Sequence, residues 1–479
     1  MINKIREKMN KIPLAVKVSA AYAVCSIILR CLSFITLPLF TRLLTKEQYG
    51  QGTIYSSWSG VLSIFITLNL AYGSFSTAMV KYEKYRDEYI SAIQGIFVMF
   101  AGVFFMIYIP FRSFWNQLFE LPTLFVIIMV LEILVSNAIQ LWSGKKRFEF
   151  KYKSVVVITL LGAVLSSVLA YIFVLCIEER GYARILGCAT GNILIGSFIF
   201  VSNFAKGKKI YDKEFWKFAL GFNLPLLAYY LSQIIFNTSD RIMISHMSGT
   251  GDAAMYGVAY GFAMMISFVL NAINNSYIPW LYGKIKDGKG EENKLVSIVI
   301  TILMAVMILF IIWFAPEIIL IMAGRQYASA VYVVAPVAMS LLLLFYSQLF
   351  INIEFYYEEK KMLVWASIGA AVLNIFLNYL LIPVLGFVAA GYTTLISYIV
   401  FAVSNYFAMK AIILKRELPD NLYDYKLLIF LFILFMILGF AGVALYEWII
   451  PRIFITVTVL IIIFGYRKKL IEVLRLIKK

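Results

Sequence analysis

The sequence predicts an all-α, polytopic membrane protein with about fourteen transmembrane helices. Of its 479 residues, 62% are hydrophobic and only 14% are charged, and the mean hydropathy is +0.86. A soluble protein has roughly 45–50% apolar residues and about 25% charged residues. The apolar residues are also gathered into repeated runs of about 20 or more, the length at which a helix crosses ~30 Å of hydrocarbon.

The predicted spans follow one another with short connections. They cover residues 18–40, 50–73, 89–111, 121–143, 154–177, 184–204, 217–239, 253–282, 295–315, 330–353, 363–384, 388–409, 427–446 and 449–466. The first run is too long for the apolar part of a signal peptide and is followed by further spans, so we expect it to stay in the mature chain. Two basic loops divide the chain into three parts. These are an N-terminal lobe of six spans at 1–205, a second lobe of six spans at 206–425, and a final helix pair with a basic tail at 426–479.

The net charge of +17 is explained by topology. If the N-terminus is cytoplasmic, the inner segments hold 34 of the 43 Lys and Arg residues, the outer loops hold 8, and Arg30 lies inside a span. This distribution is what the positive-inside rule predicts when both termini are cytoplasmic. The charge therefore gives no indication of a nucleic-acid partner.

Both ends of the chain show amphipathic patterns. Residues 1–12 place apolar side chains near one helical face, and residues 467–479 place leucines opposite lysines. Such segments are typical of helices that lie on the anionic inner leaflet, and a solvated basic tail is the alternative.

The first and seventh spans show a weak internal repeat. Each has an arginine at its exit, Arg42 or Arg241, followed by a short polar loop and a Tyr-Gly pair that opens the next span. Two such halves are typical of alternating-access transporters.

Polar side chains form stripes along several spans. In the first span Tyr22, Ser26 and Arg30 recur at helical spacing, so they share one face. Other spans carry Gln233, Asn237 and Asp240; Asn271, Asn274 and Asn275; Gln348 and Asn352; and Asn374 and Asn378. Any single amide can simply form a hydrogen bond between two helices, which contributes ~0.6 kcal/mol. Together the stripes predict a water-filled cavity suited to sugars, with Arg241 near its outer mouth.

Arg30 and Glu132 are ionisable residues at about mid-depth in the first and fourth spans. A charge there costs from ~2.5 to more than 10 kcal/mol, so an intramembrane ionisable residue is a functional hypothesis by default. Arg30 either binds an anionic ligand or forms a buried ion pair with Glu132. Glu132 either tunes Arg30, carries a proton or completes that pair.

Catalytic and metal chemistry have little support in the sequence. His246 is the only histidine, and the four cysteines lack metal-ligand spacing, so we expect no metal site, no cofactor and no enzymatic activity. An integral-membrane glycosyltransferase or polymerase usually needs a sizeable outer loop, and the predicted outer loops have about a dozen residues or fewer.

Four stretches together resemble a known family. They are "LSFITLPLFTRLLTKEQYGQGTIYSSW", "GFNLPLLAYYLSQIIFNTSDRIMI", "AGRQYASAVYVVAPVAM" and "VLNIFLNYLLIPVLGFVAAGYTTLISY". The chain resembles the Wzx-type flippases of O-antigen and capsule repeat units. These belong to the MOP superfamily, which also contains the MATE drug exporters and the lipid II flippase.

The resemblance implies a MATE-like fold and a location in the bacterial inner membrane. It also implies that an oligosaccharide linked to undecaprenyl diphosphate moves from the inner to the outer leaflet, with membrane lipid and other polysaccharide assembly proteins as partners. Arg30 would then face the diphosphate, because a guanidinium matches phosphate geometry. The expected substrate-binding residues are Tyr22, Ser26, Arg30, Asn237, Asp240, Arg241, Asn271, Asn275, Asn374 and Asn378.

Other functions remain open at this point. A MATE-like exporter of small cationic molecules is one, although its cavity would be acidic and aromatic rather than centred on an arginine. A glycosyltransferase or polymerase, a nonspecific scramblase and a structural assembly protein are the others. The glycan, the energy source and the oligomeric state are not specified by the sequence.

Overall fold

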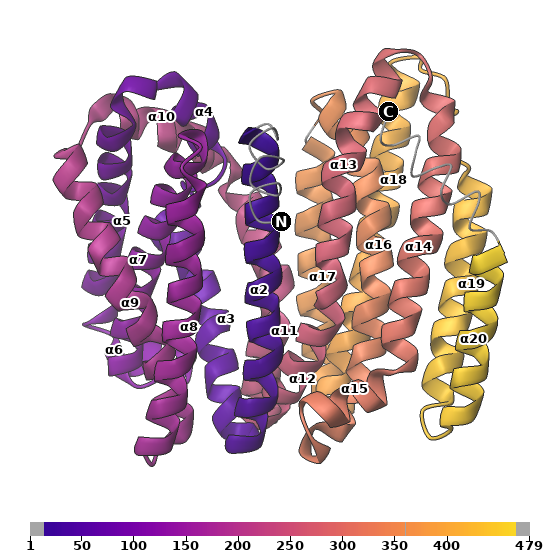
Figure 1. Cartoon of the computed structure of the whole chain (residues 1–479), viewed down its shortest axis with the longest axis horizontal. Helices are drawn as coiled ribbons and strands as arrows, with labels where there is room; N and C mark the ends of the chain where they lie inside the picture. The colour runs from indigo at the N-terminus through magenta and orange to yellow at the C-terminus, as the bar shows by residue number, and fades with distance from the viewer. Residues whose placement is uncertain (1–13, 360, 466–479) are drawn as a thin grey trace, which may run out of the picture. The chain divides into compact units, whose positions relative to one another are not determined.

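The computed structural model describes residues 14–359 and 361–465, which are helical or in connecting turns and contain no strand (Figure 1). The helices are α2 (Leu14–Leu43), α3 (Lys46–Thr67), α4 (Ser74–Lys81), α5 (Arg86–Tyr108), α6 (Arg112–Phe119), α7 (Thr123–Phe148), α8 (Tyr152–Cys176), α9 (Arg180–Gly207), α10 (Lys213–Asn223), α11 (Leu227–Ser248), α12 (Thr250–Ala263), α13 (Ser267–Lys286), α14 (Asn293–Trp313), α15 (Ala315–Met322), α16 (Val331–Tyr356), α17 (Lys361–Leu385), α18 (Phe387–Lys415), α19 (Tyr425–Ala444) and α20 (Ile449–Gly465).

Twelve helical segments of the described chain are long and apolar enough to cross a membrane, which confirms a multi-pass membrane protein. Two predicted spans, those at 50–73 and 449–466, are formed by α3 and α20, which are not among the twelve. The helix α3 ends early because Leu68 and Asn69 adopt left-handed backbone angles (φ 47° and 54°). The amphipathic segments predicted at 1–12 and 467–479 lie outside the described residues.

The chain divides into two compact units, Met1–Thr238 and Ser239–Lys479. The boundary falls within α11, whereas the sequence places the boundary between the lobes at the basic loop near 206. The helix α10 explains the difference, since it packs on unit 1. The indole nitrogen of Trp216 donates to the carbonyl of Ala92 at 2.9 Å, and the amide of Asn223 donates to Ser74 at 2.6 Å. The division into lobes at 1–205 and 206–425, predicted from the basic loops, remains a proposal.

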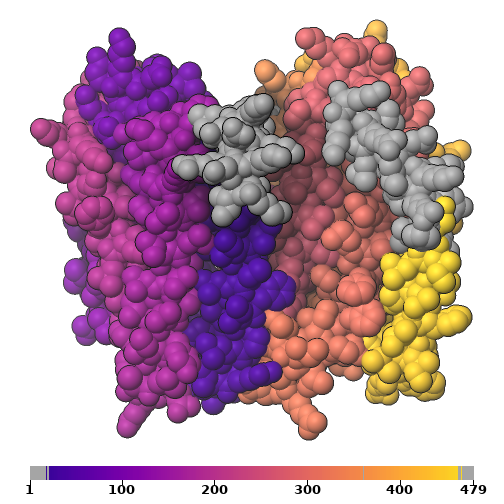
Figure 2. Space-filling view, viewed as in Figure 1, coloured from indigo at the N-terminus to yellow at the C-terminus, as the bar shows by residue number. Residues whose placement is uncertain are grey.

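Unit 1 is held by α3, α5, α7 and α9, whose apolar faces form its core, while α8 packs on α9 and on α2. A Thr-x-x-Gln capping box starts α3, in which Thr45 and Gln48 satisfy each other's backbone amides. Figure 2 shows the indigo surface of α2 beside the magenta surface of α8 on one face of this unit. Few of the residues on α8 are buried, as expected for a helix that faces lipid.

Two glycines let α8 and α9 approach closely. Gly187 and Gly191 form a G-x-x-x-G pattern in α9, a motif that brings membrane helices into backbone contact. A Cβ atom added at Gly191 would lie 2.5 Å from the Cα of Ser166, and one at Gly187 would lie 2.4 Å from the Cα of Ala170. The two backbones leave no room for a side chain at either position.

Replacing Gly191 with leucine is therefore expected to destabilise unit 1. Overpacking costs about 1–3 kcal/mol, and more where backbone must move. The melting temperature of the purified protein and its monodisperse yield should both fall. Gly102→Leu is the matched control, because an added Cβ at Gly102 meets nothing within 4 Å. Equal stability of the two variants would contradict the close packing.

Unit 2 is built around α16, which is buried on nearly all sides by α12, α14, α18 and α19. Its apolar residues surround the whole helix, the pattern of a helix in the interior. The last helix is fixed by an ion pair between the buried Arg452 of α20 and the partly exposed Glu317 of α15, with both carboxylate oxygens 2.7–2.8 Å from the guanidinium. Arg452 also donates to the carbonyls of Trp313 and Tyr446, so the final helix pair is anchored to the unit.

Candidate functional site

Arg30 lies at the middle of α2 and is exposed on the surface of unit 1. The structure also places Tyr22 and Ser26 along the same helix, with Ser26 exposed and Tyr22 partly buried. Tyr22 is eight residues before Arg30, which is ~12 Å along the helix axis. The three residues therefore follow α2 from its first third to its centre.

Glu132 of α7 has partners that the sequence did not suggest. The phenol of Tyr55 donates to one carboxylate oxygen at 2.8 Å, and the amide of Asn192 donates to the other at 2.7 Å. Asn192 in turn accepts a hydrogen bond from Ser166 at 3.0 Å. This chain of hydrogen bonds links α3, α7, α9 and α8 at mid-depth, so Glu132 has two hydrogen-bonding partners besides any role with Arg30.

Two neighbouring cavities lie within unit 1. The larger, about 430 Å³, is lined by α4, the turn before it, the end of α7 and the start of α8. The smaller, about 220 Å³, lies deeper, between α2, α7, α8 and α9, and includes Leu29 and Asn192 in its lining. Both contain Ile139 and Thr159 in their walls, so they adjoin. Together the two cavities extend from the end of α7 to the level of Arg30.

Unit 2 contains a buried polar cluster centred on Asp240, whose side chain is fully buried. The carboxylate accepts hydrogen bonds from Tyr256 at 2.5 Å, from the amide of Asn378 at 2.6 Å and from Thr394 at 2.9 Å. Asn374 adds a contact to Asn378 at 3.3 Å. We define these five residues, with Thr393 and Ser239 at their edge, as the Asp240 cluster.

The Asp240 cluster gathers two hydroxyl groups and one amide group around a single carboxylate. Carboxylate, amide and hydroxyl oxygens are the ligands that hard cations take, and a buried carboxylate is also a group that can take up a proton. The described residues include no group of three His, Cys, Asp or Glu side chains suited to a tightly held metal. A single carboxylate with neutral hydroxyl and amide neighbours is chemically suited to take up a proton or a small monovalent cation.

The other predicted residues are spread over separate surfaces. Arg241 follows Asp240 and lies over the ring of Tyr260, 4.6 Å from its centroid. Asn271 and Asn275 are exposed on α13, and the amide of Asn237 donates to the backbone of its own helix at 2.6 Å. Asp240, Asn374 and Asn378 are closed to solvent, so a glycan does not reach them in this conformation.

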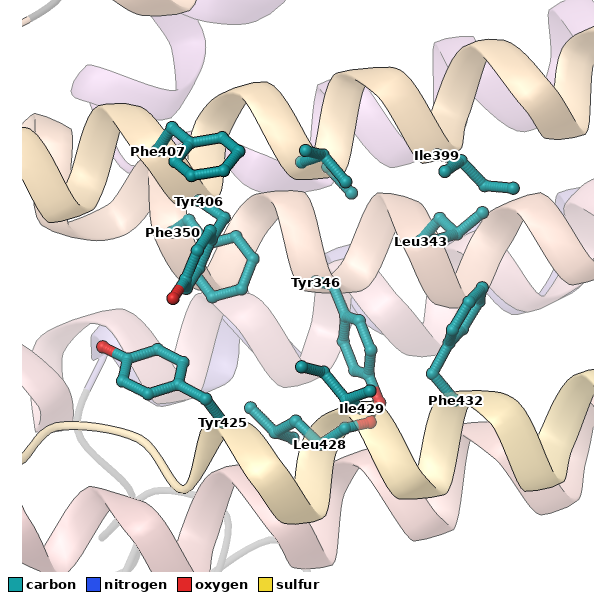
Figure 3. A pocket seen from close by; sticks show the side chains of 12 residues that line it. Leu343, Tyr346, Phe350, Ile399, Tyr406, Phe407, Tyr425, Leu428, Ile429 and Phe432 are labelled. Atoms are coloured by element: carbon teal, nitrogen blue, oxygen red, sulfur yellow. Dashed lines mark hydrogen bonds between the residues drawn. The ribbon is translucent and has the colours of Figure 1, made fainter.

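A third cavity, of about 300 Å³, lies in unit 2 among α16, α18 and α19 (Figure 3). Its wall is made of aliphatic and aromatic side chains, and Tyr406, Phe407, Phe350 and Tyr425 gather at one end. The ammonium of Lys410 lies 4.0 Å from the centroid of the Tyr425 ring. This groove offers apolar contacts and lacks the polar groups that a sugar requires.

Several residues of these sites were not predicted from the sequence. Tyr256 and Thr394 donate to Asp240, and Thr393 donates to Asn378. Tyr55 and Asn192 donate to Glu132. Asn192 is a lone amide in an apolar span, and this isolation is a sequence signal that could have identified it. Tyrosine and threonine are common in spans, so their meeting with a carboxylate was visible only in the fold.

The chain is similar to proteins of polysaccharide synthesis. Residues 15–283 match the protein family described as polysaccharide biosynthesis protein. Lsg locus putative protein 1 of Haemophilus influenzae is 22% identical over 369 residues, which are 75% of this chain and 89% of that protein. An uncharacterized membrane protein of the same organism is 22% identical over 290 residues, 57% of this chain and 66% of that protein.

The fold is similar to that of solved transporters. The lipid II flippase MurJ in an inward closed conformation aligns with a TM-score of 0.66 and 16% identity over 93% of this chain and 99% of that chain. An inward-facing multidrug resistance MATE transporter of the MOP superfamily aligns with a TM-score of 0.63 and 14% identity, covering 80% and 94%. The predicted MATE-like, all-helical fold is confirmed.

Proposed function

Because the chain belongs to the polysaccharide biosynthesis protein family, we propose that it is a flippase for lipid-linked oligosaccharides. It would move undecaprenyl-diphosphate-linked repeat units from the inner to the outer leaflet of the bacterial cytoplasmic membrane by alternating access, with both termini cytoplasmic. Membrane lipid and the lipid-linked glycan would be its partners, and other polysaccharide assembly proteins would act beside it. The proposal describes a transporter and not an enzyme.

The observation that supports this proposal most is the exposed Arg30 at the centre of α2. A guanidinium at mid-depth is costly unless an anion compensates it. The diphosphate of the cargo brings such an anion into the membrane, and the planar fork of arginine binds phosphate oxygens in pairs. Ser26 on the same face would add a hydroxyl. Within unit 2, the exposed amides Asn271 and Asn275 are the residues that we propose for sugar hydroxyls.

The Asp240 cluster would have a different role from glycan binding. Its carboxylate is buried among hydroxyl and amide groups and is not accessible to a bulky ligand. A proton or small monovalent cation is small enough to bind there. Protonation, or rotation of the Asn378 amide to present its oxygen, would change the hydrogen bonds that join α11, α12, α17 and α18. Such a change would couple an ion to the conformation of unit 2.

A deletion strain tests the proposed function. Cells without the protein should accumulate completed lipid-linked repeat units on the inner leaflet, because synthesis continues while translocation stops. The sidedness of the glycan is measured with an impermeant glycosidase on intact and on opened cells. Loss of the lipid-linked unit itself would indicate a glycosyltransferase, and an unchanged glycan with new drug sensitivity would indicate a MATE-like exporter.

A further inference from the structure

The basic segment at the end of α7 is mostly neutralised by ion pairs. Lys145 pairs with Asp87 at 2.5 Å and with Glu149 at 3.3 Å. Lys146 and Lys151 also pair with Glu149, at 3.2 and 3.0 Å. These contacts place every lysine of residues 145–151 beside a carboxylate.

Glu149 remains a carboxylate at any physiological pH. Burial raises the pKa of its carboxyl group, but the hydrogen bonds and positive charges of Lys151, Lys145 and Lys146 outweigh this and lower the pKa to about 2. The lysine charges in this segment are therefore balanced locally. They are not available to attract a further anion as strongly as an unbalanced cation would.

Arg147 is the exception in this segment. Among the described residues no carboxylate lies within ion-pair distance of it, and its guanidinium carbon is 5.1 Å from the centroid of the Tyr22 ring on α2. The ring orients the guanidinium by a cation–π contact, which does not neutralise its charge. Arg147 is also exposed, so its donors can reach a ligand.

Arg147 belongs to the wall of the 430 Å³ cavity of unit 1. The other polar side chains of this wall are neutral hydroxyls and an amide, contributed by Tyr72, Ser76, Gln140, Ser143 and Thr159. The described wall holds no carboxylate. The volume of the cavity is within the ~300–1,000 Å³ that is usual for small-ligand pockets. One unbalanced guanidinium with several neutral donors is the donor set that binds phosphate groups.

The position of this cavity fits an early step of translocation. It is lined by the turn between α3 and α4, by the start of α4 and by the end of α7, and the loops at this end are cytoplasmic under the positive-inside assignment. The smaller cavity adjoins it and reaches Leu29, the neighbour of Arg30. Tyr22, which contacts Arg147, lies ~12 Å along α2 from Arg30. An anion held at Arg147 would thus lie beside Tyr22, which is ~12 Å along α2 from Arg30.

We infer that the cavity around Arg147 is a first binding site for the diphosphate head group of a membrane-anchored lipid, occupied before the diphosphate reaches Arg30. This inference rests on the proposed function, since it takes the cargo to be a polyprenyl diphosphate. Arg147 and the hydroxyls of the cavity bind phosphate oxygens at the cytoplasmic end of unit 1. The polyprenyl tail stays in lipid and holds the diphosphate near the cavity, an advantage that soluble pyrophosphate lacks. The glycan takes no part in binding at this site.

Binding of farnesyl diphosphate, a short polyprenyl diphosphate, tests the inference on the purified full-length protein by native mass spectrometry. Arg30→Ala serves as the background for every variant, so that binding reports the cavity and not the later site. Arg147→Gln removes the charge, Arg147→Lys keeps the charge without the fork, and Gln140→Leu removes a neutral donor. Lys146→Gln is the matched control, because it removes a charge one residue away that is already paired with Glu149.

Arg147→Gln should weaken farnesyl diphosphate binding at least tenfold, Arg147→Lys and Gln140→Leu should weaken it severalfold, and Lys146→Gln should leave it within twofold. Phosphatidylglycerol and inorganic pyrophosphate should compete poorly. Equal binding by Arg147→Gln and the control would overturn the inference. Displacement by phosphatidylglycerol at equal concentration would overturn it in favour of a bulk-lipid site, and tight pyrophosphate binding in favour of a soluble anion.

Failure of this inference can be told apart from failure of the proposed function. If Arg147→Gln binds farnesyl diphosphate normally while wild-type protein still moves lipid-linked oligosaccharide, only the cavity assignment is wrong. If wild-type protein neither binds farnesyl diphosphate nor moves the oligosaccharide, both are wrong.

Discussion

Arg30→Ala is expected to reduce translocation of the lipid-linked oligosaccharide by about a hundredfold while the protein stays folded and inserted. Loss of a charge-assisted, bidentate contact to phosphate is worth about 3 kcal/mol, and each 1.4 kcal/mol is about tenfold. Arg30→Lys should keep partial activity because it retains the charge without the planar fork. Transport is measured in proteoliposomes, and folding by melting temperature and monodisperse yield.

The alternative role of Arg30, as the structural partner of Glu132, predicts a different pattern. Removing one member of a buried pair costs up to ~3–5 kcal/mol, so the yield of Arg30→Ala would fall and Glu132→Gln would restore it. The structure favours a stable Arg30→Ala protein, because Glu132 also accepts hydrogen bonds from Tyr55 and Asn192. Full transport by the Arg30→Ala, Glu132→Gln double variant would show that no cargo phosphate needs this arginine.

Asp240→Ala is expected to destabilise unit 2, and Asp240→Asn is expected to stop transport with a smaller loss of stability. Alanine leaves the hydroxyls of Tyr256 and Thr394 and the amide of Asn378 without their buried acceptor, at ~1–3 kcal/mol for each group. Asparagine keeps the size and one acceptor oxygen but cannot carry the carboxylate charge. Melting temperature and transport under imposed proton and sodium gradients measure the two effects.

Asp287→Asn is the matched control for this series, since it removes an exposed carboxylate after α13, outside the Asp240 cluster. It should change neither stability nor the response to gradients. Transport by Asp240→Asn at the wild-type rate, with the same dependence on the gradient, would contradict a coupling role and leave the Asp240 cluster with a purely structural one.

The sequence predicted the fold well because bilayer thickness sets the length of each helix. The predicted spans overlap helices in the described chain, although α3 and α20 are not among the twelve membrane-crossing candidates. The spans at 217–239 and 253–282 are each divided by a 3₁₀ turn, at Leu224–Leu226 and at Met264–Ile266. Left-handed residues Leu68 and Asn69 stop α3 early, and the polar contacts of Trp216 place α10 on unit 1. Such endings depend on single backbone angles and on tertiary contacts, which hydropathy does not encode.

The candidate sites were predicted less completely. Helical spacing correctly put Tyr22, Ser26 and Arg30 along one helix, and it identified Asp240, Asn374 and Asn378 as polar residues of spans. Spacing could not show which stripes meet. The fold buries the second set around one carboxylate, whereas Ser26 and Arg30 of the first set are exposed and Tyr22 is partly buried. The sequence identifies Arg147 only as one of many cytoplasmic charges. Its lack of a carboxylate partner among the described residues is visible only in the fold, because it depends on how Lys145, Lys146 and Lys151 are paired.

The most direct test of the proposed flippase is movement of its cargo by the purified protein. Proteoliposomes carry a polyprenyl-diphosphate-linked oligosaccharide in both leaflets, and a glycosidase added outside digests only the glycan that is exposed there. With wild-type protein the inner-leaflet glycan should become digestible over time, with Arg30→Ala it should stay protected, and a labelled phosphatidylcholine should not move in either case. Continued protection of the inner-leaflet glycan with wild-type protein, under every imposed gradient, would contradict the account.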